Sequence, residues 1–292
     1  MKFSFLFIIF LLNILSVCGQ DDMLSLLDVE ETIEYTYASF KTNRVVNLHS
    51  LENTAGGVLD FKISHRFGTL NGGFYELFGL DNSTIRIGFD YGLFDVFTVG
   101  LGRSSYEKTY DGFLKYKLLR QSTGKRKMPI TLALLFTSAV QTLKWADPDR
   151  DNYFSNRLYY TSQLIIGRKF NESFTLQLSP TLVHRNLVKT NLEKNDVYAL
   201  GAAGRIKLSK RVTLNAEYIY LLPDQVADNI TNSLSIGFDI ETGGHVFQLH
   251  CSNSTSMIEK GFISENTEKW GDGGIHFGFN ISRVFTIRPK KI

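Results

Sequence analysis

The sequence predicts an all-β protein, a single up-and-down antiparallel transmembrane β-barrel of about 12 strands with a short N-terminal periplasmic arm. Three observations favour this fold. Strand-like segments follow one another from about residue 57 to 285, apolar and polar residues alternate within them, and the links between them are alternately short and long. Tight turns at one end and larger loops at the other are typical of barrels in a bacterial outer membrane.

The N-terminus is typical of a secretory signal peptide. Lys2 precedes an apolar run over residues 3–15, and the stretch that ends at Gly19 supplies the small residues of a cleavage site. The run is too short to span a bilayer, so we assign residues 1–19 to a signal peptide and expect export through the general secretory pathway. Cys18 leaves lipidation open as an alternative, although Val17 stands where a lipoprotein site has Gly or Ala.

Residues 20–55 precede the first clear strand. The stretch 21–34 is acidic and contains leucines, and 40–48 has β character. We interpret 20–55 as an N-terminal periplasmic arm, and the sequence leaves open whether this arm enters the barrel and blocks it. The barrel itself is expected over residues 56–287, followed by a C-terminal tail of residues 288–292.

The two-residue period of the strands is the main evidence for the barrel. In residues 59–67 the apolar positions are every second residue, and Asp60, Lys62 and Arg66 lie between them. Such alternation places one set of side chains on each face of a sheet. The same pattern recurs at 85–91, 234–240 and 275–281. Further strands are expected at about 96–105, 111–120, 129–142, 157–170, 174–187, 197–208, 212–222 and 245–253.

The links follow from this strand count. An even number of strands leaves both ends of the barrel on the periplasmic side. Inner links are then short, except that residues 121–128 contain Lys125, Arg126 and Lys127. A secreted β-sandwich also alternates, but its strands are usually about 5–6 residues long, so strand length and loop asymmetry favour the barrel. The longer outer links are expected at 68–83, 105–110, 143–156, 188–196, 223–232 and 254–274.

Composition narrows the class of protein further. The net charge of +3 gives no reason to expect nucleic-acid binding. Aromatic residues make up 13% of the chain and prolines number only 5, which suits long strands with aromatic girdles. After signal cleavage Cys251 is the only cysteine, so no intramolecular disulfide is expected. No later segment approaches the run of about 18 apolar residues that a membrane helix needs.

Several strings in the chain are distinctive. They are GVLDFKISHRFG (57–68), FGLDNSTIRIGFDYG (78–92), GRSSYEKTYDGFLKYKLLRQ (102–121), TGGHVFQL (242–249) and GFNISRVF (278–285). Together they resemble a family of outer-membrane β-barrel proteins of Gram-negative bacteria that is catalogued as a domain of unknown function. The resemblance runs from about Phe40 to Phe285 and implies the barrel and the outer membrane. It carries no established activity, substrate or catalytic residue.

The C-terminal strand departs from the general outer-membrane pattern. Many such barrels end on a C-terminal aromatic residue, but here seven residues follow Phe285. Arg283 also falls on the apolar register of that strand. We expect Arg283 at the membrane edge, where a cation costs about 0–1 kcal/mol instead of about 2–4 kcal/mol at the midplane.

Alternation sends a mixed set of charged residues toward the lumen. These charges would select a solute if the lumen is a narrow pore or a binding site. The same charges would instead pair across the barrel and plug it, because buried charges must be paired or hydrated. The sequence leaves both interpretations open. The lumen-lining candidates are Asp60, Lys62, Arg66, Arg86, Asp90, Arg205, Lys207, Glu217, Asp239 and His250.

Other candidate chemistry is weaker. His250 and Ser252 share one strand face as a base and a nucleophile would, but that face is the lumen, which is the wrong face for a phospholipid ester. The histidines are scattered without zinc-like spacing. We therefore expect no catalytic residue, no metal and no cofactor. The outer-loop binding candidates, where an aromatic residue stands beside charges, are Trp145, Asp147, Asp149 and Arg150.

Two functional hypotheses follow. The first is an outer-membrane channel or binding barrel for a small polar solute. The alternative is a non-conducting membrane scaffold whose loops or N-terminal arm engage a periplasmic or surface protein. An outer-membrane lipid-modifying enzyme is the least favoured, and the protein is expected not to be an enzyme. Outer-membrane lipid is an expected partner in every case.

Overall fold

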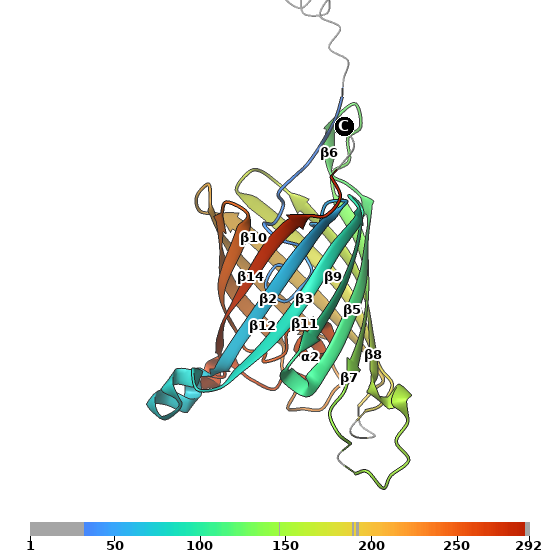
Figure 1. The fold of residues 1–292 in the computed structure, drawn as a ribbon, viewed down its shortest axis with the longest axis vertical. Coiled ribbons are helices and arrows are strands. Elements are labelled where there is room, and N and C mark those ends of the chain that lie inside the picture. Colours follow the sequence, from blue (N-terminus) through green and yellow to red (C-terminus); the bar gives the residue numbers. More distant parts are fainter. Residues whose placement is uncertain (1–31, 146, 189, 191–192, 290–292) are drawn as a thin grey trace, which may run out of the picture.

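The structure confirms the predicted fold. It is a computed structural model that describes residues 32–145, 147–188, 190 and 193–289. Twelve antiparallel strands form one closed barrel (Figure 1). The expected signal peptide and Cys18 lie outside the described residues. None of the helices within the described part of the chain is long and apolar enough to cross a membrane.

The barrel strands follow the sequence-predicted segments closely, because the two-residue period runs through most of each segment. The first strand pairs with the last, as Ile63 opposite Ile281 illustrates, and this pairing closes the barrel. The strands are β2 (Val58–Thr69), β3 (Ser83–Phe94), β4 (Phe97–Ser104), β5 (Thr109–Leu119), β7 (Thr131–Gln141), β8 (Leu158–Lys169), β9 (Phe174–Arg185), β10 (Asp196–Lys207), β11 (Val212–Leu221), β12 (Ser233–Thr242), β13 (His245–Ser252) and β14 (His276–Thr286).

Smaller elements lie at the two ends of the barrel. At the end with short links, β1 (Ile33–Tyr35) pairs with β6 (Ser122–Gly124) and stands above the rim in Figure 1. This end also holds both ends of the described chain, and we call it the short-turn end. The opposite, long-loop end carries η1 (Leu70–Gly79), η2 (Tyr106–Lys108), η3 (Phe154–Arg157), α2 (Glu259–Ser264) and η4 (Trp270–Asp272).

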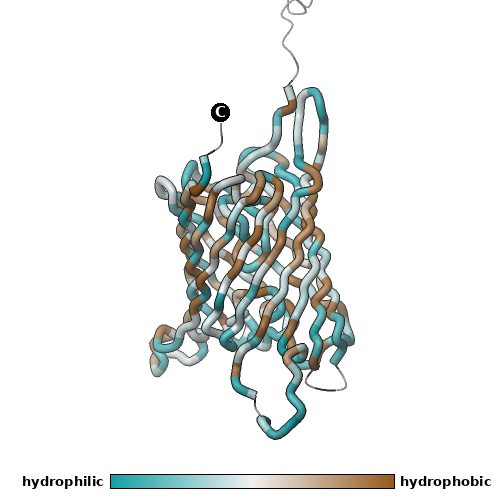
Figure 2. The backbone as a smooth tube through the Cα atoms, turned by 45° about the vertical axis from the view of Figure 1, so that its right-hand side comes forward, coloured by the Kyte–Doolittle hydropathy of each residue, from teal (hydrophilic) through white to brown (hydrophobic). Residues whose placement is uncertain are grey.

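The outer face of the barrel wall is apolar, whereas the inner face carries polar and charged side chains as well as apolar ones. On β3 the side chains of Ile87 and Phe89 are exposed, whereas those of Arg86 and Asp90 are buried. Apolar and polar positions alternate along the strands in the same way around the barrel (Figure 2). Arg283 lies on the outer face opposite His245, next to the turn between β12 and β13, which places it at the short-turn edge of the wall.

Two segments of the chain fill the lumen. Residues 39–54, which we call the luminal arm, enter from the short-turn end, and most of them are buried. Residues 253–266, the luminal loop, fold inward from the long-loop end and include α2, whose six residues are all buried. The link over residues 254–274 is therefore not simply an outer loop, because Phe262 and Ile263 bury their side chains in the core of the barrel.

Candidate functional site

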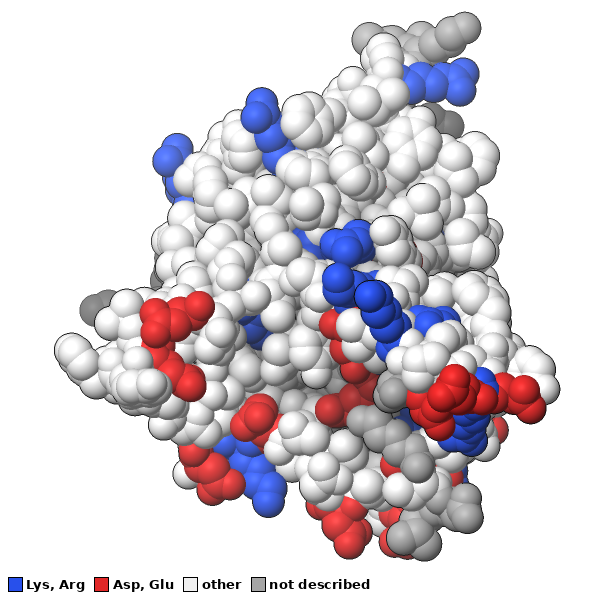
Figure 3. Space-filling view, turned by 60° about the horizontal axis from the view of Figure 1, so that its bottom comes forward, with Lys and Arg blue, Asp and Glu red and all other residues white. Residues whose placement is uncertain are grey.

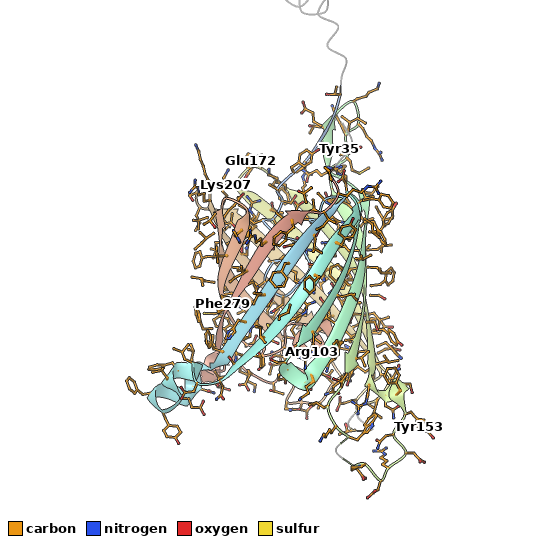
Figure 4. All side chains as sticks on the ribbon, in the orientation of Figure 1. Tyr35, Arg103, Tyr153, Glu172, Lys207 and Phe279 are labelled. Carbon is orange, nitrogen blue, oxygen red and sulfur yellow. The ribbon has the colours of Figure 1, made fainter. Side chains whose placement is uncertain are left out.

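The structure places nine of the ten lumen-lining candidates inside the barrel with buried side chains. The exception is Lys207, which is the last residue of β10 and lies half-buried at the short-turn rim (Figure 4). The alternation along β10 points Lys207 inward, but the strand ends at this residue, so its side chain lies at the rim and not inside the lumen. The nine buried residues are Asp60, Lys62, Arg66, Arg86, Asp90, Arg205, Glu217, Asp239 and His250.

Oppositely charged residues pair on the inner face of β2, β3 and β5. The guanidinium Nε of Arg86 donates to Asp111 Oδ1 at 2.9 Å. The ammonium of Lys62 lies 3.1 Å from Asp90 Oδ2 and 3.5 Å from Asp60 Oδ2. Sequence reasoning missed Asp111, although its inward register on β5 could have indicated it. These charges are compensated by neighbours in the wall, as buried charges must be.

Glu217 on β11 binds the backbone of the luminal arm. Its carboxylate accepts hydrogen bonds from the amides of Val46 at 3.1 Å, Asn47 at 2.8 Å and Leu48 at 3.0 Å. Three successive amides converging on one carboxylate form an anion-binding concavity, in which the arm supplies the donors and the barrel supplies the anion. A residue expected to face solute therefore holds a part of the same chain.

Other inward side chains bind arm carbonyl groups in the same way. Arg205 donates to the carbonyl of Ser39 at 2.7 Å and also to that of Ala38. The ammonium of Lys115 donates to the carbonyl of Glu52, and the amide of Gln177 donates to the carbonyl of His49 at 2.7 Å. The bonds come from β5, β9 and β10, so the arm is held across the width of the lumen.

The arm also has an apolar side, which packs against one part of the inner wall. Leu48 and Leu51 are fully buried in a core cluster with Leu135 of β7, Ile165 of β8 and Val183 of β9.

Glycines in the wall make room for these leucines. A β-carbon added at Gly167 would lie 2.7 Å from Leu51 Cδ1, and one at Gly201 would lie 3.1 Å from Leu48 Cδ1. The inner wall is thus shaped to the arm at these two positions.

The luminal arm and the luminal loop meet inside the barrel. Arg44 of the arm donates through Nη1 to Glu259 Oε1 of the loop at 2.9 Å, and His49 Nε2 lies 3.4 Å from the same oxygen. Arg66 of β2 contacts both segments, because its Nη2 donates to Asn47 Oδ1 at 3.0 Å and its Nη1 donates to the carbonyl of Ser254. The contents of the barrel are therefore joined to each other as well as to the wall.

Lys260 anchors the luminal loop near the long-loop end. Its ammonium lies 2.6 Å from Glu107 Oε2 and 2.7 Å from Glu265 Oε2, and it stands 4.3 Å from the ring centre of Tyr159. Burial alone would lower the pKa of Lys260, but Glu265 and Glu107 outweigh burial and raise it above its ordinary value. Lys260 is therefore charged at physiological pH.

His250 and Ser252 do not form a base–nucleophile pair. The Nε2 atom of His250 lies 3.0 Å from Arg66 Nη2, and the hydroxyl of Ser252 bonds to that of Ser235 at 2.9 Å. Both residues are buried beneath the arm. No group of acidic, histidine or cysteine side chains suited to a metal ion occurs in the described ranges.

The four outer-loop candidates do not all contact one another. The ring of Trp145 is covered by the guanidinium of Arg157 at 3.7 Å. Asp147 Oδ1 accepts a hydrogen bond from the backbone amide of Asp149 at 3.2 Å. Arg150 is exposed. The loop is thus a polar, solvent-facing turn with one cation–aromatic contact, and Tyr153 marks it in Figure 4.

A cavity of about 460 Å³ opens beside the arm at the short-turn end. Polar and apolar residues line it, and the polar ones include Asn43, Glu52 and Asp60. A much smaller cavity of about 20 Å³ lies deeper, lined by Arg44, Lys62 and Gln248 among others. Both cavities lie along the side of the lumen made by β2, β12, β13 and β14.

Residues 40–285 match the model of a protein family described as "Membrane bound beta barrel domain (DUF5777)". The chain belongs to this family. The match covers all but the first residue of the luminal arm, the whole luminal loop and all but the last residue of the barrel strands. A comparison with curated proteins finds no significant match.

Solved structures that resemble this family member are bacterial outer-membrane barrels. A NanC porin shares 8% identity over 78% of this chain and 98% of its own, with a TM-score of 0.50. An outer membrane channel from Pseudomonas putida F1 shares 14% identity over 80% and 98%, with a TM-score of 0.46. An active-site variant of outer membrane phospholipase A from Escherichia coli shares 11% over 85% and 98%, with a TM-score of 0.47. At such identities the likeness concerns the fold alone.

Proposed function

We propose that this protein is a non-conducting scaffold of the bacterial outer membrane, exported by the secretory pathway, whose lumen is filled by its own chain. In this proposal the short-turn end faces the periplasm and the long-loop end faces outward. The observation that carries it is the binding of Val46, Asn47 and Leu48 by Glu217. The barrel uses inward charges such as Glu217 and Arg205 to hold the luminal arm, and others pair with one another in the wall, which leaves these charges engaged within the protein.

The apolar part of the inner wall supports the same proposal. Leu135, Ile165 and Val183 point inward and are fully buried beneath the arm. If the arm left, these side chains would line a water-filled lumen, and exposing apolar surface to water is unfavourable by about 25 cal/mol per Å². The arm therefore behaves as part of the core, in contrast to a gate that swings freely.

A scaffold needs surfaces that reach beyond the membrane, and the chain has them at both ends. The loop over residues 142–157 extends from the long-loop end with exposed charges, and the small sheet of β1 and β6 extends from the other. A partner protein is expected at one of these surfaces. The proposal includes no catalysis, because His250 and Ser252 are engaged with other groups under the arm.

A narrow channel for a small polar solute is the second candidate function. The cavities of about 460 Å³ and 20 Å³ favour it, since both lie on the polar side of the lumen. A solute path on this side would pass Lys62, which lines the deeper cavity. Lys62→Glu would then change the ion preference of the conductance.

Recording from the purified mature protein in planar bilayers separates the two functions. The scaffold proposal expects no conductance steps. Steps whose ion preference changes in Lys62→Glu, but not in the rim variant Lys207→Glu, would overturn it in favour of the channel.

Site-specific photo-cross-linking then tests for a partner. A photoreactive residue at Tyr153 or Glu34 is expected to give one defined protein adduct in intact cells. The buried position Leu48 is the matched control and is expected to give none. The absence of any adduct at both exposed positions contradicts a scaffold that acts through these surfaces.

A further inference from the structure

Residues 70–80, which we call the lateral lobe, expose an unusual amount of apolar surface. Phe74 is 82% exposed and Tyr75 is 94% exposed, and about half of the surface of Leu77, Phe78 and Leu80 is accessible. The rings of Phe74 and Phe78 meet edge to face at 5.8 Å. Folded proteins seldom leave an apolar cluster of this kind in water, and such a patch marks an interaction surface.

The lobe lies beside the barrel wall. Figure 1 and Figure 2 show it projecting sideways at the long-loop end, and in Figure 3 it is the mostly white projection at the left. Its base is fixed to the barrel, because the amide of Leu70 donates to the carbonyl of Ile275 at 2.9 Å and that of Asn71 donates to Gly273 at 3.1 Å. A sideways projection from the rim of a membrane barrel lies over the surrounding lipid.

The outer wall next to the lobe is aromatic. Phe67, three residues before the lobe, lies on the outer face of β2 with its ring 6.0 Å from that of Phe277 and 6.4 Å from that of Phe279 on β14. Aromatic side chains at this level of a transmembrane barrel form the girdle at the membrane interface. The apolar surface of the lobe is therefore continuous with the lipid-facing surface of the wall.

Two bulky residues of the lobe adopt an uncommon backbone conformation. Leu77 and Phe78 adopt positive φ angles of 46° and 54°, a region that bulky side chains seldom occupy. Such strain persists only when surrounding interactions favour it. Within the described chain most of the surface of Phe74 and Tyr75 is uncovered, so this part of the lobe is open to contacts from outside the protein.

Charge distinguishes the lobe from the other long loop. Residues 70–80 contain a single charged side chain, Glu76, and no Lys or Arg. Residues 142–157 contain Lys144, Asp147 and Arg150 among other charges. The two loops leave the same end of the barrel, yet only the charged one has the composition of a water-facing loop.

We infer that the lateral lobe inserts its aromatic side chains among the acyl chains of the adjacent lipid leaflet and anchors the barrel at the membrane interface. An amphipathic segment lying in the interface plane buries its apolar face about 5–10 Å deep. This inference needs only that the barrel lies in a membrane, so it stands or falls separately from the scaffold and channel proposals.

Lipid quenching of a fluorophore tests the inference directly. The full-length mature protein carries Cys251→Ser and one new cysteine, at Tyr75→Cys or Phe78→Cys, labelled with an environment-sensitive dye. It is reconstituted into phosphatidylcholine vesicles with and without spin-labelled acyl chains. The lipid-facing position Leu101→Cys is the positive control, and Tyr153→Cys in the charged loop is the negative control.

We expect quenching at positions 75 and 78 to approach that at 101 and to exceed that at 153 several-fold. Heat-modifiable migration on gels verifies that each variant is folded, and the second lobe position secures the test if the first fails to fold. Quenching at both lobe positions no greater than at 153 overturns the inference. Disulfide-linked dimers through position 75 without quenching also overturn it, in favour of a second copy of the chain as the occupant.

Discussion

The two sides of the lumen hold the luminal arm by different means. On the side of β7, β8 and β9, Leu48 and Leu51 pack against Leu135, Ile165 and Val183. Around the rest of the wall, on β2, β3, β5 and β10 to β14, charged and polar side chains contact the arm through hydrogen bonds such as that from Asn43 Nδ2 to Asp90 Oδ2 at 2.7 Å. The apolar side holds the arm by burying its leucine side chains, and the polar side holds it by directional hydrogen bonds.

This difference teaches how a barrel keeps a segment in its lumen. Apolar packing is favourable but has no preferred direction, so alone it would permit the arm to shift along the wall. Bonds to Glu217, Arg205 and Lys115 fix particular backbone groups at particular heights in the barrel. The two sides together specify one position.

The largest effect is expected for Glu217→Ala, which removes the acceptor of three arm amides. Each buried amide left without a partner costs about 1–3 kcal/mol. Hydrogen exchange of the amides of Val46, Asn47 and Leu48 is expected to accelerate strongly. Glu172→Ala, in the exposed turn between β8 and β9, is the control and should leave those amides protected. Unchanged exchange in Glu217→Ala would show that the apolar side alone positions the arm.

Arg86→Ala is expected to follow, since it leaves Asp111 buried without its partner. Breaking a buried ion pair in this way destabilises a protein by about 3–5 kcal/mol. Denaturant titration of the detergent-solubilised protein measures the loss. The double variant Arg86→Ala with Asp111→Ala should lose less than the single variant. A double variant that loses the sum of both single changes contradicts a direct coupling of the two charges.

Leu48→Ala tests the apolar side. A buried leucine truncated to alanine costs about 2–5 kcal/mol, and here the loss should appear as easier release of the arm with the wall intact. Limited proteolysis within residues 39–54 measures this release. Leu101→Ala, on the lipid-facing surface, is the matched control. If both changes leave the arm equally protected, the apolar side does not hold it.

The smallest effect is expected for Glu172→Gln in the turn between β8 and β9. The hydrogen bond from Lys169 lowers the pKa of Glu172 below its ordinary value, so the stabilisation is present at neutral pH and is lost as the pH falls through that lowered pKa. Because Glu172 is exposed, the pair contributes only about 0–1 kcal/mol. Melting curves of the variant and the wild type should differ slightly at pH 7, and this difference should shrink as the pH falls. A larger difference at pH 3 would contradict the assignment.

The wall of the barrel could be predicted from the sequence, because a two-residue period is a local property. Residues 59–67 and 234–240 show on their own which side chains face inward. The contents of the lumen could not be predicted, since the arm has no regular secondary structure and is held through its backbone amides and carbonyls. Which amides meet Glu217 leaves no trace in the side chains of residues 46–48.

Some of the residues that sequence reasoning missed could have been found from the sequence pattern. Phe262 and Ile263, like Met257 and Ile258, are adjacent apolar residues in a largely polar link. Such pairs are expected to be buried, and in the structure Phe262 and Ile263 join the core. Asp111 lies on the inward face of β5, and the preceding residue, Tyr110, is exposed on the outward face. Lys207 shows the converse error, because a correct register does not reveal that a strand has reached the rim.

The luminal arm leads into β2 through residues 55–57, and the luminal loop leads into β14 through η4. These are the two strands whose pairing closes the cylinder. A finished barrel has no free edge through which a folded segment could enter from the side. The two segments that fill the lumen therefore flank the seam, and assembly of this protein can bring each of them to its own open end of the barrel as the seam closes.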